Sequence, residues 1–70
     1  MSEVRAQITG VVFKIEKQVG DSVEEGEAIL ILESMKMEIP VESPVSGVIA
    51  SVAVAIGDSV VEDQVVAMLG

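Results

Sequence analysis

The chain has 70 residues, half of them hydrophobic, with 12 acidic and 4 basic side chains and a formal net charge of −8. This length fits one domain, and an acidic surface with a single aromatic residue argues against partners such as nucleic acid or anionic lipid. Because cysteine and histidine are absent, the sequence offers no disulfide, no thiolate and no imidazole, and we assign no catalytic residue and no metal ligand.

The N-terminal residues 1–5 lack the pattern of a signal or transit peptide, and no apolar run approaches the ~18 residues that a membrane span needs. We therefore expect a cytoplasmic protein with no membrane partner. Residues 4–8 are predicted to form the first strand.

Residues 11–17 alternate with a period of two, which predicts a strand. The following Gly20-Asp21 indicates a turn, because glycine accepts positive φ and aspartate caps its own backbone. The short stretch 22–23 is expected to be a minor strand. Residues 28–33 are a nearly continuous apolar run rich in β-branched side chains, as expected for a buried strand.

The rest of the chain continues in short strands. We expect these strands at residues 37–42, 48–54, 59–60 and 65–69. Pro40 lacks an N–H donor, which favours an edge position for the strand that contains it. With six to eight short strands and no credible helix, the sequence predicts an all-β fold, a flattened β-barrel or sandwich of antiparallel sheets.

The chain also overlays itself when it is shifted by 37 positions. Eight of the 23 positions in residues 10–32 are then identical, and Gly-Asp-Ser-Val occurs in both copies. Two like halves usually form a pseudo-two-fold structure in which each covers the apolar face of the other. We therefore divide a single domain, residues 1–70, into half-repeats at about 6–32 and 43–69, joined by a hairpin at 33–38.

The joining hairpin has no counterpart in the other half. Its sequence, Glu-Ser-Met-Lys-Met-Glu, places Met35 and Lys36 at the tip and Glu33 opposite Glu38. A two-residue tip favours Asn-Gly, because both positions need positive φ, and like charges on opposed strands are unfavourable. Local rules broken in this way tend to mark functional sites.

The chemistry that Lys36 offers is acylation of its primary amine. Only the neutral amine attacks an activated carbonyl, and this chain has no evident base to deprotonate it, so a second protein must act. The two methionines provide flexible apolar contact surface, and the two glutamates provide charges that set the register of docking. The alternative, an ordinary surface lysine, is disfavoured because Lys36 is the only basic residue after Lys17.

These residues resemble the biotinyl/lipoyl attachment domain family over nearly the whole chain. The matching positions are Gly10, Gly20-Asp21, Gly26, the hairpin 33–38, residues 43–47 and Gly57-Asp58. The resemblance implies two four-stranded antiparallel sheets with internal pseudo-two-fold symmetry, with the lysine hairpin in one sheet and both termini in the other. The chain departs from the family pattern at Gln7 and at Asp63, which stands where the first half has Gly26.

The resemblance also implies a function. Lys36 would carry covalent biotin, attached by a biotin protein ligase that recognises Met35 and Met37, with Glu33 and Glu38 as further candidates for ligase discrimination. The biotin would shuttle a carboxyl group between a biotin carboxylase site and a carboxyltransferase site. The chain would thus be a carrier, part of a biotin-dependent carboxylase and not an enzyme by itself.

Two alternatives stay open at this point. A lipoyl carrier of a 2-oxo acid dehydrogenase-type system would have the same fold and lysine, although lipoyl domains usually place aspartate or other small or polar residues beside it. A cofactor-free interaction module would never be modified at Lys36. A calcium module is disfavoured, because the acidic residues around Glu24 lack the Asp-x-Asp-x-Asp-Gly spacing.

Overall fold

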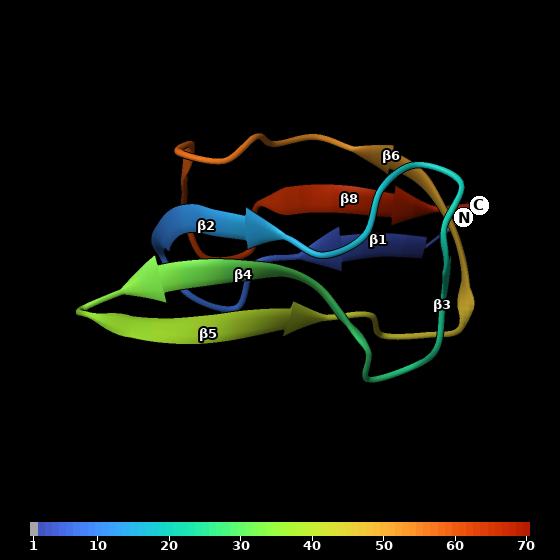
Figure 1. Ribbon diagram of the computed structural model, residues 1–70, viewed down its shortest axis with the longest axis horizontal. Coiled ribbons are helices and arrows are strands. Elements are labelled where there is room, and N and C mark those ends of the chain that lie inside the picture. Colours follow the sequence, from blue (N-terminus) through green and yellow to red (C-terminus); the bar gives the residue numbers. More distant parts are fainter. Residues whose placement is uncertain (1) are drawn as a thin grey trace.

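The computed structural model describes residues 2–70, so residue 1 of the expected domain lies outside the described part. The strands are β1 (Ser2–Arg5), β2 (Gly10–Ile15), β3 (Ser22–Val23), β4 (Ala28–Ser34), β5 (Met37–Glu42), β6 (Gly47–Val52), β7 (Ser59–Val60) and β8 (Val65–Leu69). They form two four-stranded antiparallel sheets, ordered β1-β8-β6-β3 and β5-β4-β2-β7 (Figure 1). Residues 2–70 contain no helix, and the predicted all-β fold is confirmed.

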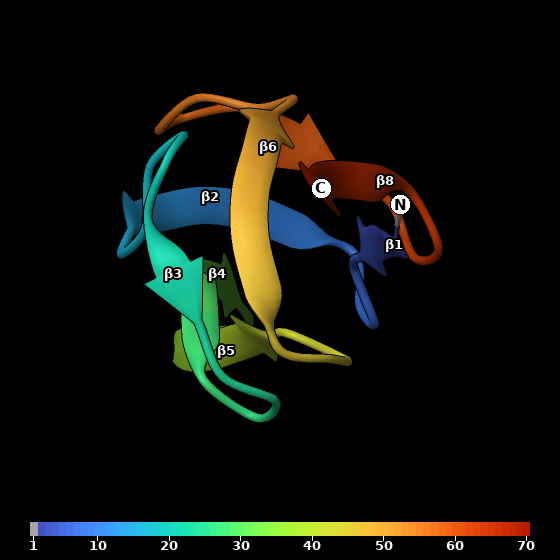
Figure 2. The same cartoon turned by 90° about the vertical axis from the view of Figure 1, so that its right-hand side faces the viewer.

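The two sheets are related by the shift of 37 positions that the sequence shows. This shift carries β1 to β4 onto β5 to β8 and converts the strand order of one sheet into that of the other. The register is preserved in detail, because Val12 pairs with Leu32 in one sheet and Ile49 pairs with Leu69 in the other. Figure 2 shows β6 of one sheet crossing over β2 of the other. The predicted pseudo-two-fold symmetry is thus confirmed.

The Gly-Asp turns join the halves through reciprocal backbone hydrogen bonds. The Gly20 N–H donates to the Ile49 carbonyl, and the Ile49 N–H donates to the Asp21 carbonyl, both at 2.9 Å. Val12 makes the same two bonds, both at 2.8 Å, with the turn at residues 57–58. Because backbone polar groups need partners once they are buried, each half completes the hydrogen bonding of the other.

The core between the sheets is aliphatic. Its buried members are Val4, Ala6, Val12, Val23, Ile29, Leu30, Leu32, Val41, Ile49, Val60, Val66, Ala67 and Leu69. Phe13, the only aromatic residue, stands at the β-bulge of β2 and is 46% exposed, so it adds little to this core. Removing such aliphatic surface from water contributes about 25 cal/mol per Å² and is the main stabilising term for a domain without disulfides.

Four strands, β3, β5, β7 and β8, have the bounds that the sequence predicts, whereas the others shift by one to three residues at an end. β1 begins earlier than expected and ends at Arg5, because the chain then bends to enter β2. β2 ends at Ile15, since the N–H groups of Glu16 and Lys17 both donate to the carbonyl of Ile29, at 2.8 and 3.1 Å. Two donors on one acceptor end the regular ladder, although the alternation of side chains continues.

Candidate functional site

The hairpin between β4 and β5 protrudes from one end of the molecule (Figure 1). The start of β1 and the end of β8 lie side by side at the opposite end, where Ser2 pairs with Leu69. The molecule is elongated, with principal extents of 31 × 18 × 18 Å. The hairpin is therefore the part of the body farthest from the paired end strands.

The register of the hairpin agrees with the sequence prediction. Glu33 pairs with Glu38 and Ser34 pairs with Met37, so Met35 and Lys36 form a two-residue tip. β5 is an edge strand of its sheet, as the proline within it predicts. The two strands therefore carry the tip beyond the rest of the sheet.

Both tip residues adopt the left-handed conformation. φ is 52° at Met35 and 66° at Lys36. A two-residue hairpin needs positive φ at both central positions, and each L-residue with a side chain pays about 1–2 kcal/mol for it. Asn-Gly would satisfy the same turn with less strain. The tip therefore keeps these two side chains at the expense of local stability, a pattern that is typical of functional sites.

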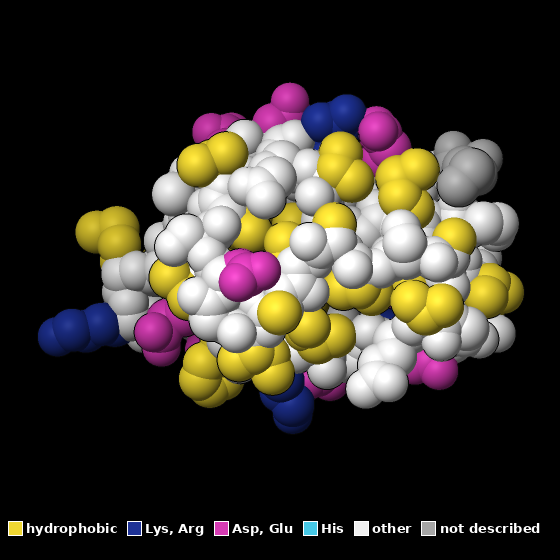
Figure 3. Space-filling model, turned by 90° about the horizontal axis from the view of Figure 1, so that it is seen from above, with side chains coloured by type: hydrophobic (Ala, Val, Ile, Leu, Met, Phe, Trp, Pro, Cys, Tyr) yellow, Lys and Arg dark blue, Asp and Glu magenta, His cyan; other side chains and the backbone are white. Residues whose placement is uncertain are grey.

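The tip side chains are open to solvent. Met35 is 89% exposed and Met37 is 57% exposed, and Lys36 between them is exposed as well. At the end of the molecule that carries the hairpin, Figure 3 shows basic and apolar side chains standing clear of the body. The amine and its apolar neighbours are therefore accessible from solvent without any rearrangement of the barrel.

Lys36 also differs from the other basic residues in its charge partners. The ion pairs of the described residues are Arg5–Glu3 at 2.7 Å, Arg5–Asp63 at 3.9 Å, Lys14–Glu16 at 3.2 Å and Lys17–Glu27 at 2.8 Å. Within residues 2–70, Lys36 is thus the one basic side chain without an ion pair. A partner that approached this amine would break no ion pair within residues 2–70.

Glu33 and Glu38 lie directly opposite each other at the base of the hairpin, and both are exposed. Neither belongs to an ion pair among the described residues. Opposed like charges are unfavourable, and a basic group of a partner would relieve the repulsion. The base of the hairpin is therefore suited to contact a cationic surface.

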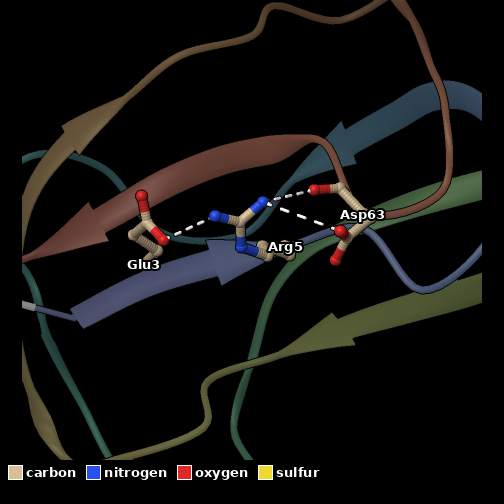
Figure 4. Close-up of polar contacts among 3 residues, drawn as sticks. All are labelled: Glu3, Arg5 and Asp63. Carbon is tan, nitrogen blue, oxygen red and sulfur yellow. Dashed lines mark hydrogen bonds and ion pairs between the residues drawn. The ribbon is translucent and has the colours of Figure 1, made fainter.

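Another polar cluster joins β1 to the turn before β8. Arg5 donates from Nη2 to Glu3 at 2.7 Å and from Nη1 to the Asp63 carbonyl at 2.7 Å (Figure 4). The hydrogen bond that Arg5 donates to Glu3, together with the negative charge of Glu3, raises the pKa of Arg5. Asp63 has φ 74° in the place where Gly26 has φ 86°, so the departure noted in the sequence conserves the conformation. We read this cluster as structural, since Arg5 holds a positive-φ turn in place.

The described residues contain no group of three or more potential metal ligands, and no helix in them is long and apolar enough to cross a membrane. The arrangement at the hairpin suits one task, the presentation of a primary amine. Among residues 2–70, no buried acid or base lies beside that amine.

Comparisons with known proteins agree with this geometry. Residues 1–69 match the biotin/lipoyl family, described as "Biotin-requiring enzyme". The "Biotinylated protein TB7.3" of Mycobacterium tuberculosis is 46% identical over 39 residues, which are 56% of this chain and 55% of that protein. The "Biotin/lipoyl attachment protein" of Bacillus subtilis is 47% identical over 38 residues, 54% of this chain and 52% of that protein. The matched segment thus spans about half the length of these curated relatives.

Solved structures share the fold. The urea carboxylase of Kluyveromyces lactis matches with a TM-score of 0.94 and 32% identity, over 99% of this chain and 6% of that chain. A single-chain, multi-domain long-chain acyl-CoA carboxylase matches with a TM-score of 0.84 and 26% identity, over 94% and 6%. The lipoyl domain of the 2-oxoglutarate dehydrogenase complex from Azotobacter vinelandii matches with a TM-score of 0.72 and 29% identity, over 89% and 78%.

Proposed function

This chain belongs to the biotin/lipoyl attachment family, and we propose that it is a biotin carrier whose Lys36 is the biotinylated residue. The observation that carries the proposal is the tip itself: an exposed amine without an ion pair, held by a strained turn between two exposed methionines. We also propose that residues 1–70 act as one attachment domain, with the two half-repeats as its scaffold and the hairpin at 33–38 as its working part.

The residues at the tip fit an amide-linked cofactor. Attachment requires Lys36 Nζ to lose a proton and to form a bond with the activated carboxyl carbon of biotin, which releases the activating group. Residues 2–70 place no buried base beside Lys36, so the proton would pass to the ligase or to solvent. Once bound, biotin would supply a ring nitrogen that accepts and donates a carboxyl group. The chain itself holds that group at the end of a long, exposed side chain.

Partners follow from the same surface. A biotin protein ligase would dock on Met35 and Met37, whose flexible thioether side chains adapt to an apolar pocket, and basic ligase residues would meet Glu33 and Glu38. The carried carboxyl group would then move between a biotin carboxylase site and a carboxyltransferase site. The similarity to domains of two carboxylases supports these partners, and the names of the relatives support biotin.

Lipoate is the alternative cofactor, and the similarity to a lipoyl domain is the observation that favours it. That similarity is weaker than the one to the urea carboxylase, with a TM-score of 0.72 against 0.94. A lipoylated chain would use the same lysine and the same amide chemistry, but would carry acyl groups.

The test is the intact mass of the chain after incubation with a biotin protein ligase, biotin and ATP, with an avidin blot beside it. We expect one biotinyl group on the wild-type chain and none on Lys36→Arg, because a guanidinium is always charged and is a poor acyl acceptor. Lys14→Arg is the matched control on β2 and should accept biotin as the wild type does.

Each other outcome has a definite meaning. Biotin on the Lys36→Arg variant would contradict the site. Failure with biotin but a lipoyl mass increment from a lipoate ligase would reassign the cofactor. No adduct from either active ligase would leave an interaction module as the better account.

A further inference from the structure

Two glycines occupy the same place in the two halves of the barrel. Gly10 is the first residue of β2 and pairs with Val60, whereas Gly47 is the first residue of β6 and pairs with Val23. Both are half-buried and neither has a positive φ. Conformational freedom is therefore not the reason for glycine at either position.

The surroundings of the two glycines differ. A Cβ atom added at Gly10 would lie 2.8 Å from the carbonyl oxygen of Glu33 and 3.4 Å from its carbonyl carbon. A Cβ atom added at Gly47 would have the Cβ of Leu69 as its nearest neighbour, at 3.7 Å, which is ordinary van der Waals contact. A backbone carbonyl yields far less readily than a flexible side chain. A side chain is thus excluded at Gly10 and tolerated at Gly47.

The carbonyl that excludes this side chain belongs to the base of the hairpin. The pairing of β2 with β4 ends at Val11 opposite Glu33, and the hairpin continues beyond that point with only its own two strands paired. A Cβ at Gly10 would also lie 3.5 Å from the Cβ of Ser34. Gly10 therefore packs against the base of the hairpin, at the point where β2 stops pairing with β4.

We propose that Gly10 is a positioning residue for the attachment hairpin, an inference that rests on the proposed role of Lys36 as acceptor. Without a Cβ, Gly10 lets β2 lie close enough to Glu33 to hold the hairpin in one direction. A side chain there pushes the Glu33 carbonyl outward and tilts both strands. Lys36 lies in the turn, two positions beyond the Glu33–Glu38 pair and roughly 7 Å further along the hairpin, so a small tilt at the base displaces the amine.

The test compares Gly10→Ala with Gly47→Ala, the same change at the equivalent position of the other half. For each variant and the wild type, kcat and KM are measured with the chain as substrate of a biotin protein ligase. The temperature is one at which thermal unfolding curves show all three chains folded. We expect Gly10→Ala to lower kcat by at least about tenfold, since misplacement of a reacting group by ~1 Å reduces rates strongly.

The expected KM of Gly10→Ala stays within about twofold, because the methionines are flexible enough to keep their contacts while the amine loses its line of attack. Gly47→Ala should match the wild type in both constants to within about twofold. A general loss of stability would instead lower the concentration of folded substrate, which raises the apparent KM and leaves kcat at saturation unchanged.

The outcomes separate this inference from the function beneath it. If the wild type is biotinylated on Lys36 and Gly10→Ala has an unchanged kcat, the positioning role is wrong and the carrier function stands. If the wild type accepts no biotin, the carrier function itself fails. If Gly10→Ala is unfolded, sucrose or trimethylamine N-oxide is added until it folds. Wild-type kcat for the refolded variant would then overturn the inference.

Discussion

The two ends of this molecule are built from equivalent paired strands, but only one pair is joined by a hairpin. At one end, β4 and β5 pair from Leu32 opposite Ile39 outward and are joined by the hairpin. At the other end, β8 and β1 pair in the equivalent register, with Leu69 opposite Ser2, and no hairpin links them. Equivalent positions form the core behind each end, so the property that distinguishes the hairpin end lies in the few residues that join its paired strands.

This comparison extends to the shape of each half. β2 and β6 have identical burial patterns, and so do β3 and β7. What differs is the chemistry at exposed positions and at the hairpin base. A symmetric scaffold thus tolerates a strained tip because the tip carries none of the core. Substitutions at equivalent positions of the two halves test that separation.

Truncation of the core should affect both halves alike. Leu32 and Leu69 are equivalent residues and are 0% and 2% exposed. We expect Leu32→Ala and Leu69→Ala each to lower the free energy of unfolding by about 2–5 kcal/mol, from lost burial and the cavity left behind. Urea denaturation measures both. A much smaller loss at Leu32 would mean that the hairpin half is supported less by the shared core than its twin.

The positive-φ turns that precede β4 and β8 offer a smaller effect. A Cβ added at Gly26 meets nothing within 4 Å, so Gly26→Ala tests conformation alone. With φ at 86°, alanine should lower the free energy of unfolding by about 1–2 kcal/mol. Gly26→Asp should lower it less, since Asp63 already holds this conformation in the other half. Equal losses in urea denaturation would refute the equivalence of these turns.

Relief of the strain at the tip should raise stability and reduce function together. We expect Met35→Asn to increase the free energy of unfolding by up to about 1 kcal/mol, because asparagine accepts positive φ more readily than methionine does. The same change removes an apolar contact and should slow biotinylation in the ligase assay. A variant that gained stability and kept wild-type ligation would show that Met35 has no part in recognition.

The smallest expected effect is on the stability of the fold at acidic pH. Lys17 donates a hydrogen bond to Glu27 at 2.8 Å, and the backbone N–H of Glu24 donates a second one. Both lower the pKa of Glu27 below its ordinary 4.5, and the bond from Lys17 has the larger effect. The stability this contributes is full above the ordinary pKa and is lost as pH falls through the lowered one. In the other half, Gln64 accepts the equivalent N–H bond, from Val61, without titrating.

Glu27→Gln makes the first half resemble the second at this position. We expect its melting temperature to fall less than that of the wild type between about pH 5 and about pH 3, and the difference to be small, because the pair is partly exposed and screened by solvent. Thermal scans at a series of pH values measure this. If the melting temperatures of the two chains fell in parallel with pH, the Lys17–Glu27 pair would make no contribution to stability in acid.

The sequence was informative wherever local rules decide the structure. The two-residue tip predicted Glu33 opposite Glu38, and the Gly-Asp pairs predicted turns, because each depends on neighbours in the chain. Strand ends were less predictable. The end of β2 depends on Ile29 accepting two hydrogen bonds, a contact between residues far apart in the sequence.

Identical residues at equivalent positions of the repeat can also have different surroundings. Gly10 and Gly47 align in the repeat and read as one kind of position, but an added Cβ would lie 2.8 Å from the Glu33 carbonyl oxygen at Gly10 and 3.8 Å from the Gly70 carbonyl oxygen at Gly47. The signal that could have distinguished them was the hairpin that follows one half alone. The roles of Lys36, Met35 and Met37 stay predictions, since sequence and geometry show presentation of an amine and not its modification.

The paired end strands have a consequence for how the chain is tethered. Whatever polypeptide or surface is joined before Ser2 or after Gly70 is attached at the pole opposite Lys36, along the 31 Å axis of the body. The barrel then acts as a rigid spacer, and Lys36 is the part that moves farthest when the domain rotates about its point of attachment. Anchoring the chain through either end would place the Lys36 amine on the side of the molecule that faces away from the anchor.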